Sequence, residues 1–531
     1  MMKKIFVCVI VGFFVLSSGM FSVVSQQIKT KRDSYNSYMS TLEDAQWTVM
    51  VYLDADNNLE YNGLEDFNEM AAIGSTSAVN IVVQFDRIDG YDYNYGDWTS
   101  TKRYLVTKYM QPTSLNAIMD IGEADMSHPQ TLIDFVSWSM DNYPATNYCL
   151  VLWDHGTGWK YAESNLRKGV CEDFTNDGQL TTEELRNAIK TVTNNGANKL
   201  EIIGFDACLM GMIEVAYELK DFGQYMVASE ETEPVSGWNY KKSLEVLVNN
   251  PIITADQLGA TFVNTYEGYE VTLATINLQD IHYIVDKIND FGEKVVGKEI
   301  YRPLVNYAYQ NVESFQDYDF VDLYHLAQLI KGYTDDPYIA TVADSLMTYI
   351  DEVVVYEKHD SYHTNVHGLS IYLPYYSIDY DYRDLRFAQD TYWDELIIWL
   401  HESPSSRAPT APSIDGKNTA TVNQAEEFIF RSTDPDGDDI YIFVDWGYND
   451  ETDLVGPKKT GEAQTGSHVW FYEGGFIIKA IAIDENGVIS DWGYLTISVP
   501  KQKTKIHPGF QSLTNLFSIK IDKIFELFSR K

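Results

Sequence analysis

The chain has 531 residues, 45% of them hydrophobic and 14% aromatic, which is enough apolar material for a large folded core. Its 33 glycines and 15 prolines are too few for a fibrous or low-complexity protein. With 39 basic against 78 acidic residues, the formal net charge of -39 argues against nucleic acids and anionic membranes as partners of the body of the protein.

The N-terminus has the pattern of a secretory signal. Two lysines precede an apolar run over residues 5–16, and small polar residues follow it. The apolar character continues to residue 24, so an uncleaved membrane anchor is the alternative. We predict a signal peptide or signal anchor at 1–25, a linker at 26–46, and a protein that is secreted or held at the cell surface.

Residues 47–401 form the first predicted domain. Short apolar runs alternate there with amphipathic stretches, which indicates strands alternating with helices. Continuous apolar strands are typical of a parallel sheet covered on both faces. We therefore predict an α/β/α sandwich with a mostly parallel sheet. The predicted strands lie at 47–53, 79–85, 148–153, 200–205, 225–228, 271–276 and 369–373.

Two helices can be placed by their first turns. Ser127, with Gln130 three residues later, predicts a capping box and a helix that runs to Met140. A second helix is predicted to begin near Thr181 and to continue through Ile189.

The pattern changes after a linker at 402–412. Short strands separated by turn-forming residues predict a small β-sandwich over 413–500. Its Asp-Pro-Asp-Gly-Asp turn at 434–438 and its Asp-Trp-Gly at 445–447 resemble the polycystic-kidney-disease (PKD) and fibronectin type III modules of secreted microbial enzymes. The predicted strands of this domain lie at 428–430, 440–444, 468–472, 476–483 and 494–499.

The last segment, residues 501–531, is a basic amphipathic tail. Its seven Lys and Arg against two acidic residues give a charge of +5, which leaves -44 for the rest of the chain. A helix of this kind can lie on a membrane or dock onto the acidic body, and both remain open.

Two strand ends carry residues that can perform chemistry together. The third and fourth predicted strands run into Asp-His-Gly at 154–156 and Asp-Ala-Cys at 206–208. The carboxyl ends of parallel strands share one edge, where open α/β sheets place their sites. A helix predicted at 211–219 would put Cys208 at its N-terminus, where the dipole favours the thiolate. We predict that His155 is a catalytic base and Cys208 a nucleophile.

Longer motifs surround these residues: Trp-Asp-His-Gly-Thr-Gly-Trp at 153–159, Gly-Phe-Asp-Ala-Cys-Leu-Met at 204–210, Ser-Glu-Glu at 229–231, Gly-Trp-Asn-Tyr at 237–240, and the segments 51–59 and 368–374. Together they resemble the clostripain family of cysteine peptidases. The resemblance covers about residues 47–401, and it implies a caspase-like fold, a His155/Cys208 dyad and cleavage after Arg or Lys. It also makes Asp206 a candidate floor of the S1 pocket, which holds the substrate residue before the scissile bond.

Acidic residues near the nucleophile fit a basic substrate. Asp206 and Cys208 are two positions apart and point the same way if the strand continues, so a carboxylate can face the pocket. The alternative role for Asp206 is an N-cap of the following helix. Glu230 and Glu231 are further candidate substrate-binding residues, although the sequence leaves open whether they line the pocket or face solvent.

The predicted mechanism is covalent catalysis by a thiolate. Cys208 attacks the scissile carbonyl, His155 protonates the departing amine, and water releases the acyl group. The main-chain amides of Gly156 and Cys208 are predicted to form the oxyanion hole. Asp154 is adjacent to His155, which makes contact between the two side chains awkward, so a dyad is preferred over a triad.

A polar segment at 160–177 separates the two catalytic residues and is predicted to be an exposed, strand-free loop. Exposed loops are where proteolytic nicking concentrates. An enzyme specific for basic residues would cut its own chain after Arg167 or Lys168. The products would be a light chain with His155 and a heavy chain with Cys208.

No cofactor is predicted to be required, and no metal ligands are assigned. Calcium remains possible, because residues 173–178 with Glu184 in the twelfth place approximate a calcium-binding loop. Thr175 occupies the third ligand position, so a loop that leads into a capped helix is the preferred interpretation.

Two other functions remain open. One is a catalytically silent surface protein that binds partners through its acidic face and β-sandwich. The other is a caspase-like peptidase with a non-basic preference, such as Asp or Asn, at P1. Polypeptides with basic residues are the predicted partners, and membrane or cell-surface contact through the N-terminal segment or the C-terminal tail remains possible.

Overall fold

The computed structural model describes residues 45–161, 168–269, 271–401, 407–447, 452–484 and 488–500. The predicted signal segment, the basic tail and Arg167 lie outside the described residues. In the part of the chain that is described, no helix is long and apolar enough to cross a membrane.

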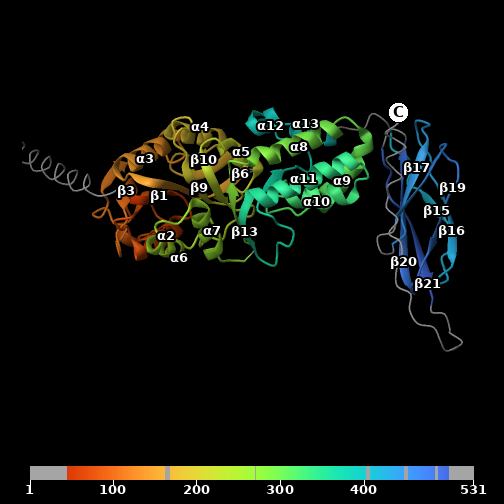
Figure 1. Ribbon diagram of the computed structural model, residues 1–531, viewed down its shortest axis with the longest axis horizontal. Helices are drawn as coiled ribbons and strands as arrows, with labels where there is room; N and C mark the ends of the chain where they lie inside the picture. The colour runs from red at the N-terminus through yellow and green to blue at the C-terminus, as the bar shows by residue number, and fades with distance from the viewer. Residues whose placement is uncertain are drawn as a thin grey trace, which may run out of the picture.

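Within the described residues, nine strands form one sheet in the order β13-β11-β10-β9-β5-β1-β2-β3-β4 (Figure 1). The five central strands run parallel, and the two strands at each side pair antiparallel. The parallel strands are β1 (Ala45–Ala55), β2 (Val79–Arg87), β5 (Ala145–Trp153), β9 (Leu200–Asp206) and β10 (Gly223–Ala228). The antiparallel strands are β3 (Thr101–Leu105), β4 (Met119–Gly122), β11 (Thr272–Asn277) and β13 (Val354–His359).

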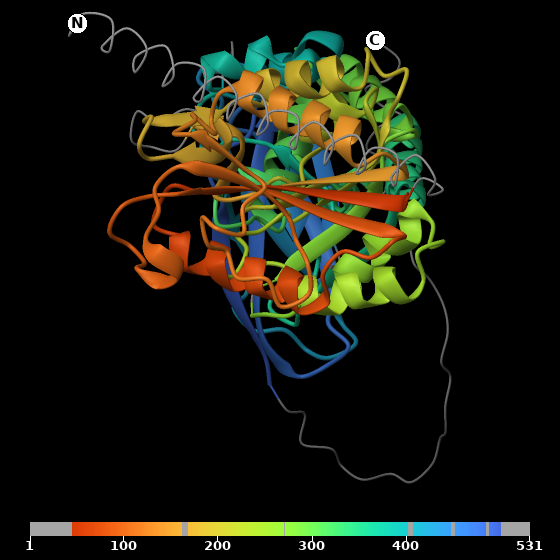
Figure 2. The ribbon, with the colours of Figure 1, turned by 90° about the vertical axis from the view of Figure 1, so that its left-hand side faces the viewer.

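Helices cover both faces of the sheet, as Figure 2 shows with the sheet seen edge-on. Alternate residues of β1 explain why: Val49 and Val51 enter one apolar core, and Met50 and Tyr52 enter the other. On the Val49 side lie α2 (Glu60–Ile73), α6 (Tyr240–Asn249) and α7 (Ala255–Thr265). On the Met50 side lie α3 (Pro129–Asn142), α4 (Thr182–Val192), α5 (Ile213–Leu219) and α8 (Ile281–Val295). The predicted α/β/α class is confirmed.

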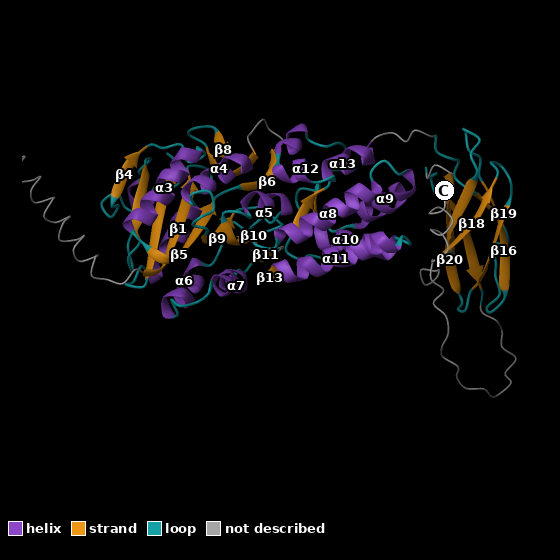
Figure 3. Cartoon of the chain, turned by 45° about the horizontal axis from the view of Figure 1, so that its top comes forward, coloured by secondary structure: helices purple, strands orange, loops and turns teal. Residues whose placement is uncertain are grey.

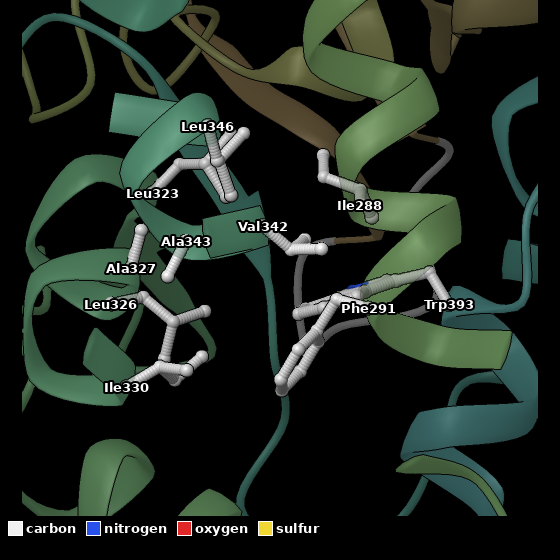
Figure 4. Close-up of a pocket in the computed structure, with 10 residues that line it drawn as sticks. All are labelled: Ile288, Phe291, Leu323, Leu326, Ala327, Ile330, Val342, Ala343, Leu346 and Trp393. Carbon is white, nitrogen blue, oxygen red and sulfur yellow. The ribbon is translucent and has the colours of Figure 1, made fainter. Parts of the chain in front are cut away.

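A group of helices extends the Met50-side core beyond the sheet (Figure 3). Here α8 packs on α11, and α11 packs on α10. The pocket in Figure 4 lies among these helices; it is lined by apolar side chains alone and contains none of the predicted site residues. The remaining helices are α9 (Arg302–Asn311), α10 (Leu323–Tyr333), α11 (Pro337–Val353), α12 (Arg386–Asp390) and α13 (Trp393–His401), with 3₁₀ turns η1 (Asn94–Gly96), η2 (Glu299–Tyr301) and η3 (Tyr380–Asp384).

Two small sheets correct the sequence-based prediction. The apolar run at 369–373 forms β14 (Ser370–Tyr372), which pairs with β12 (Phe320–Asp322) and does not join the large sheet. The segment at 160–177 is not free of strands, because β6 (Gly156–Tyr161), β7 (Lys168–Asp173) and β8 (Gly178–Leu180) pair antiparallel. An apolar run does not reveal which partner it pairs with, and β7 has only two buried apolar side chains, those of Val170 and Cys171, within a mostly polar segment.

One of the two predicted helix starts is correct. Thr181 and Glu184 form the reciprocal capping box of α4. The N-cap of α3 is His128, whose ring accepts a hydrogen bond from the amide of Gln130 at 3.1 Å. Ser127 instead donates its hydroxyl to the carboxylate of Asp125. The predicted N-cap was wrong by one position, because the imidazole of His128 accepts the hydrogen bond that was expected to go to the hydroxyl of Ser127.

The C-terminal domain has the predicted β-sandwich architecture. Phe428, Trp446 and Trp470 lie in its buried core. One of the predicted strands, at 468–472, is mostly wrong, because β19 ends at Val469. The sheet of three strands contains β15 (Ser413–Asp415), β16 (Ala425–Arg431) and β19 (Gln464–Val469), and the sheet of four contains β17 (Ile440–Asp445), β18 (Thr452–Lys458), β20 (Gly474–Asp484) and β21 (Gly493–Val499), counted over the described residues.

Candidate active site

The two predicted catalytic residues leave neighbouring strands at the same edge of the sheet. Strands β5 and β9 are parallel, with Trp153 opposite Asp206, and the amide of Asp154 extends the ladder by donating to the carbonyl of Asp206 at 3.2 Å. His155 and Cys208 follow at equivalent places. Register between the two strands therefore brings the imidazole and the thiol to one site.

Gly156 allows close contact between the two strand ends. A Cβ atom at this position would come within 2.3 Å of the carbonyl oxygen of Cys208 and 3.1 Å of its nitrogen. Any larger residue would push the histidine loop away from the nucleophile.

An asparagine that the sequence interpretation missed holds the imidazole. The Nε2 atom of His155 lies 3.0 Å from Oδ1 of Asn58, and Nδ1 makes no hydrogen bond with a described residue. An amide oxygen accepts, so Nε2 carries the proton and Nδ1 is free to act as the base. Asn58 lies just past β1, the neighbour of β5, and that position at the shared edge was the available signal.

The loop that carries Asn58 is itself anchored. Asn57 donates from Nδ2 to Oδ1 of Asp154 at 2.7 Å and to the carbonyl of Glu172 at 3.0 Å. The second carboxylate oxygen of Asp154 accepts from the amide of Glu172. Asp154 thus joins the β1 loop to β7, and its carboxylate is committed to contacts other than the imidazole of His155.

Cys208 does not lie at a helix N-terminus, which corrects the prediction. It sits in a tight turn after β9, where Leu209 has a φ of 62°, and α5 begins only at Ile213. Its Sγ atom accepts a hydrogen bond from the amide of Glu233 at 3.2 Å. Burial, together with the charge of Glu231, raises the pKa of the thiol despite this donor.

The resting dyad is therefore a neutral pair. Burial lowers the pKa of His155, and burial raises that of Cys208, so both uncharged forms are favoured. No helix dipole supplies a standing thiolate. The thiol must transfer its proton to the imidazole as it attacks. No described residue accepts a hydrogen bond from the Cys208 amide, so this predicted oxyanion donor is available.

Asp206 is buried next to the nucleophile and is not an N-cap, since Met212 occupies that position in α5. Its Oδ1 accepts from the amide of Trp238 at 3.1 Å, and its Oδ2 accepts from the hydroxyl of Tyr240 at 2.8 Å. Burial raises the pKa of Asp206 to about 6. The carboxylate is thus held in place by two hydrogen bonds, and it loses its charge as the pH falls through about 6.

Glu233 lies beside Asp206 and shares its surroundings. Its Oε1 accepts weakly from the indole of Trp238 at 3.4 Å, and its Oε2 is buried without a hydrogen-bond partner among the described residues. Burial and the charge of Asp206 raise the pKa of Glu233 well above its usual range. Within the described chain, no lysine or arginine forms an ion pair with either carboxylate.

The two other predicted substrate-binding residues point elsewhere. Glu230 accepts from the amide of Gly368 at 2.7 Å, and Glu231 accepts from the amide of Gln316 at 3.0 and 3.1 Å. Both side chains are buried. They hold neighbouring segments in place, and Glu233 is the glutamate that adjoins Asp206.

Two groups of carboxylates could hold a metal ion. One consists of Asp56, Asp86, Glu123 and Asp173, and the other, in the β-sandwich, of Asp434, Asp438 and Asp484. The calcium-loop pattern suggested by the sequence does not form as such, because Glu184 caps α4.

An imidazole and a thiol that follow neighbouring parallel strands at the carboxyl edge of an α/β/α sheet, next to buried carboxylates, are the arrangement expected of a cysteine peptidase. The model of the clostripain family matches residues 51–399, and the chain belongs to that family. It is a cysteine-type endopeptidase, as the sequence predicted.

Known proteins give the extent of the similarity. Clostripain from Hathewaya histolytica is 26% identical over 392 residues, which are 62% of this chain and 74% of that protein. The structure of a secreted C11 cysteine protease from Bacteroides thetaiotaomicron with an irreversible peptide inhibitor is 18% identical, covering 66% of this chain and 99% of that chain with a TM-score of 0.51. A PKD domain of an M14-like peptidase from Thermoplasmatales archaeon SCGC AB-540-F20 is 31% identical and covers 18% of this chain and 100% of that chain, with a TM-score of 0.18.

Proposed function

We propose that the protein is a secreted endopeptidase that cleaves polypeptides after Arg or Lys. The observation that carries the proposal is the buried pair Asp206 and Glu233, which adjoins Cys208 and has no described cation. Two carboxylates out of water repel each other and favour protonation. A P1 guanidinium or ammonium would supply the missing positive partner and hold them ionised.

The catalytic steps follow from the site geometry. His155 takes the proton of Cys208 as sulfur attacks the scissile carbonyl, and Asn58 holds the resulting imidazolium in place. The amides of Cys208 and Gly156 stabilise the oxyanion. His155 then protonates the leaving amine, and water, deprotonated by the same imidazole, releases the acyl group.

A fluorogenic peptide library that varies only P1 tests this function. We expect turnover of Arg and Lys peptides by the wild type, none by Cys208→Ala, and nearly none by His155→Ala. Cys149→Ala and Cys171→Ala are matched controls, because both thiols are buried and free. Activity above about a tenth in Cys208→Ala would overturn the nucleophile. A preference for Asp or Asn at P1 would show that the specificity is not for basic residues. A wild type that cleaves none of the peptides would favour the binding-protein alternative.

Self-processing between the catalytic residues is the second part of the proposal. Residue Lys168 begins β7, and Arg167 lies outside the described residues. Cleavage after either one would leave His155 and Cys208 on separate chains, joined because β5 and β9 share the sheet. The wild type should give two bands under denaturing conditions and Cys208→Ala one. An uncut but fully active Arg167→Ala, Lys168→Ala double variant would refute activation by cleavage.

Export is the third part. The pattern at 1–25 supports it, and the similar Bacteroides thetaiotaomicron enzyme is described as secreted. Expression with this segment should deliver the protein to the medium with a new N-terminus near residue 25. Retention in the membrane fraction with the segment intact would instead establish an anchor.

A further inference from the structure

One outer face of the β-sandwich is apolar where a polar face is expected. Strands of a sandwich normally alternate apolar residues toward the core with polar residues toward solvent. In the four-stranded sheet, Ile440, Ile442 and Val444 of β17 lie in the core. The residues that alternate with them and with their neighbours are again apolar. The outer face of this sheet carries Phe443, Leu454, Ile477, Ile481, Ile483 and Tyr494.

The strand register places these six side chains next to one another. Phe443 pairs with Leu454 on β18 and with Ile481 on β20, which makes an apolar row across three strands. Ile483 and Tyr494 lie in the adjacent rows on either side of it. Tyr494 is 63% exposed, and within the described chain none of the six packs into one of the three apolar cores. The face is therefore apolar and has no described covering segment.

The outer face of the three-stranded sheet is different and follows the expected pattern. Asp415, Glu427, Arg431 and Ser467 lie on it, with Ile429 among them. Arg431 forms an ion pair with Asp415 at 3.0 Å. The apolar outer face is thus a property of one sheet and does not follow from the composition of the whole domain.

The C-terminal segment of the same chain has a matching apolar pattern. Over residues 513–528, which lie outside the described residues, apolar residues recur at the spacing of one helix face, with Lys520 and Lys523 off that face. A helix of this length measures about 24 Å, and a strand as long as β18 or β21 also measures about 24 Å. The segment is thus long enough to cover the face. Its apolar residues at this spacing are Leu513, Phe517, Ile521, Ile524 and Phe528.

Attachment and charge favour this segment over other partners. The edge strand of the face, β21, ends at Val499, and residues 500–512 connect it to the segment over at most about 45 Å. A segment on so short a tether has an effective concentration on the order of millimolar. The domain at 413–500 has 16 acidic against 5 basic residues, a charge of -11, and attracts residues 501–531 with their charge of +5. An anionic membrane is repelled by the charge of -44 on the rest of the chain.

We propose that residues 513–528 bind the outer face formed by Phe443, Leu454, Ile477, Ile481, Ile483 and Tyr494. The apolar residues of the segment would cover this face, and its lysines would meet the acidic residues of the domain. The contact buries apolar surface that the domain otherwise exposes to water. It is independent of the peptidase assignment.

Hydrogen exchange read by mass spectrometry tests this contact on the full-length Cys208→Ala protein, which lacks the proposed nucleophile. The amides of residues 513–528 should exchange at least about tenfold more slowly than those of a synthetic peptide of the same sequence. The double variant Phe443→Ser, Ile481→Ser should abolish this protection. Ile429→Ser, on the outer face of the other sheet, is the matched control and should leave it unchanged. The amides of β17 and β20 report in the same experiment whether the domain is folded.

A change in the segment itself tests the contact without altering the sheet. Phe517→Ser with Phe525→Ser should increase the oxidation of Tyr494 by hydroxyl radicals and leave that of Ile429 unchanged. The proposal is overturned if residues 513–528 exchange as fast as the synthetic peptide, or if their protection persists in the folded Phe443→Ser, Ile481→Ser variant. It is also overturned if protection disappears on dilution together with a dimer, which would identify a second copy as the partner, or if it requires anionic vesicles.

Discussion

Two groups of carboxylates flank the catalytic residues along one edge of the sheet, and they present their charge differently. In the first, Asp206 is held by the amide of Trp238 and the hydroxyl of Tyr240, and Glu233 lies beside it. In the second, Asp56, Asp86, Glu123 and Asp173 point oxygens at a common centre. Both groups lack a described basic partner, so each is suited to a cation that arrives from outside.

Geometry decides which cation each group suits. A phenol and an amide hold Asp206 in place beside the strand end that carries Cys208, where, as proposed, it would meet a basic P1 side chain. Four oxygens within 4.8 Å of one another surround a single point and suit a spherical ion. Carboxylates at the two places are thus suited to different cations, the first group, as proposed, to a basic substrate side chain and the second to a spherical ion. The predictions below separate the two.

The largest effect is expected at Asp206. Asp206→Asn should lower kcat/KM for Arg and Lys peptides by roughly 100-fold, because an unpaired buried charge costs about 3 kcal/mol. The substrate's cation would lose its partner, so KM should rise. Glu230→Gln is the control, since Glu230 bonds to Gly368 and should change these constants less. Equal turnover of Ala or Asp at P1 by the wild type would contradict the assignment.

Substitutions of Asn58 test the loop after β1, which holds the imidazole of His155. Asn58→Ala should lower kcat about 10- to 100-fold with little change in KM, because a misplaced imidazole affects the chemical step. Asn58→Asp keeps an acceptor at Nε2 and should restore part of the rate. Its carboxylate would raise the pKa of His155, so the acid limb of kcat should move to higher pH. If Asn58→Ala raised KM as well as lowering kcat, and Asn58→Asp restored neither constant, the role of Asn58 would be structural only.

The pH dependence of kcat/KM tests the first group of carboxylates, that of Asp206, without any substitution. Asp206, with its pKa raised to about 6 by burial, is charged above that pH and neutral below it. For Arg and Lys peptides, kcat/KM should therefore fall about tenfold per pH unit below about 6. A slowly cleaved peptide with a neutral P1 side chain is the control and should lack this limb, as should Asp206→Asn. If kcat/KM fell in the same way for both peptides at acid pH, the titrating group would belong to the His155/Cys208 dyad.

A buried carboxylate outside both groups gives the smallest effect. Glu214 accepts from the amide of Tyr372 and the hydroxyl of Tyr382, both at 2.9 Å, and burial raises its pKa to about 7. Its folded form favours the proton, so this contribution to stability is present below the usual pKa and is lost as pH rises through about 7. Glu214→Gln in the Cys208→Ala background should reduce the fall in thermal midpoint between pH 5 and 8 by about 2–4 °C. An unchanged slope would show that Glu214 stays ionised.

The sequence by itself determined the elements that depend on local pattern. Apolar runs placed β1, β2, β5 and β9 within a few residues, because a strand buried on both faces must be apolar along its length. The motifs at the ends of β5 and β9 placed His155 and Cys208 at one edge, since parallel neighbours share their carboxyl ends. The change to short strands after residue 412 likewise marked the β-sandwich.

Tertiary structure alone decided the contacts between segments distant in the chain. Asn58 meets His155 across 97 positions, and the group of Asp56, Asp86, Glu123 and Asp173 comes from four separate segments. The local pattern of apolar and polar residues cannot predict such contacts, because they depend on the order of the strands in the sheet and on the paths of the loops that connect them. The turn that delays α5 past Cys208, and the choice of Glu233 over Glu230 beside Asp206, depend likewise on how the segments after β9 and β10 fold back onto the sheet.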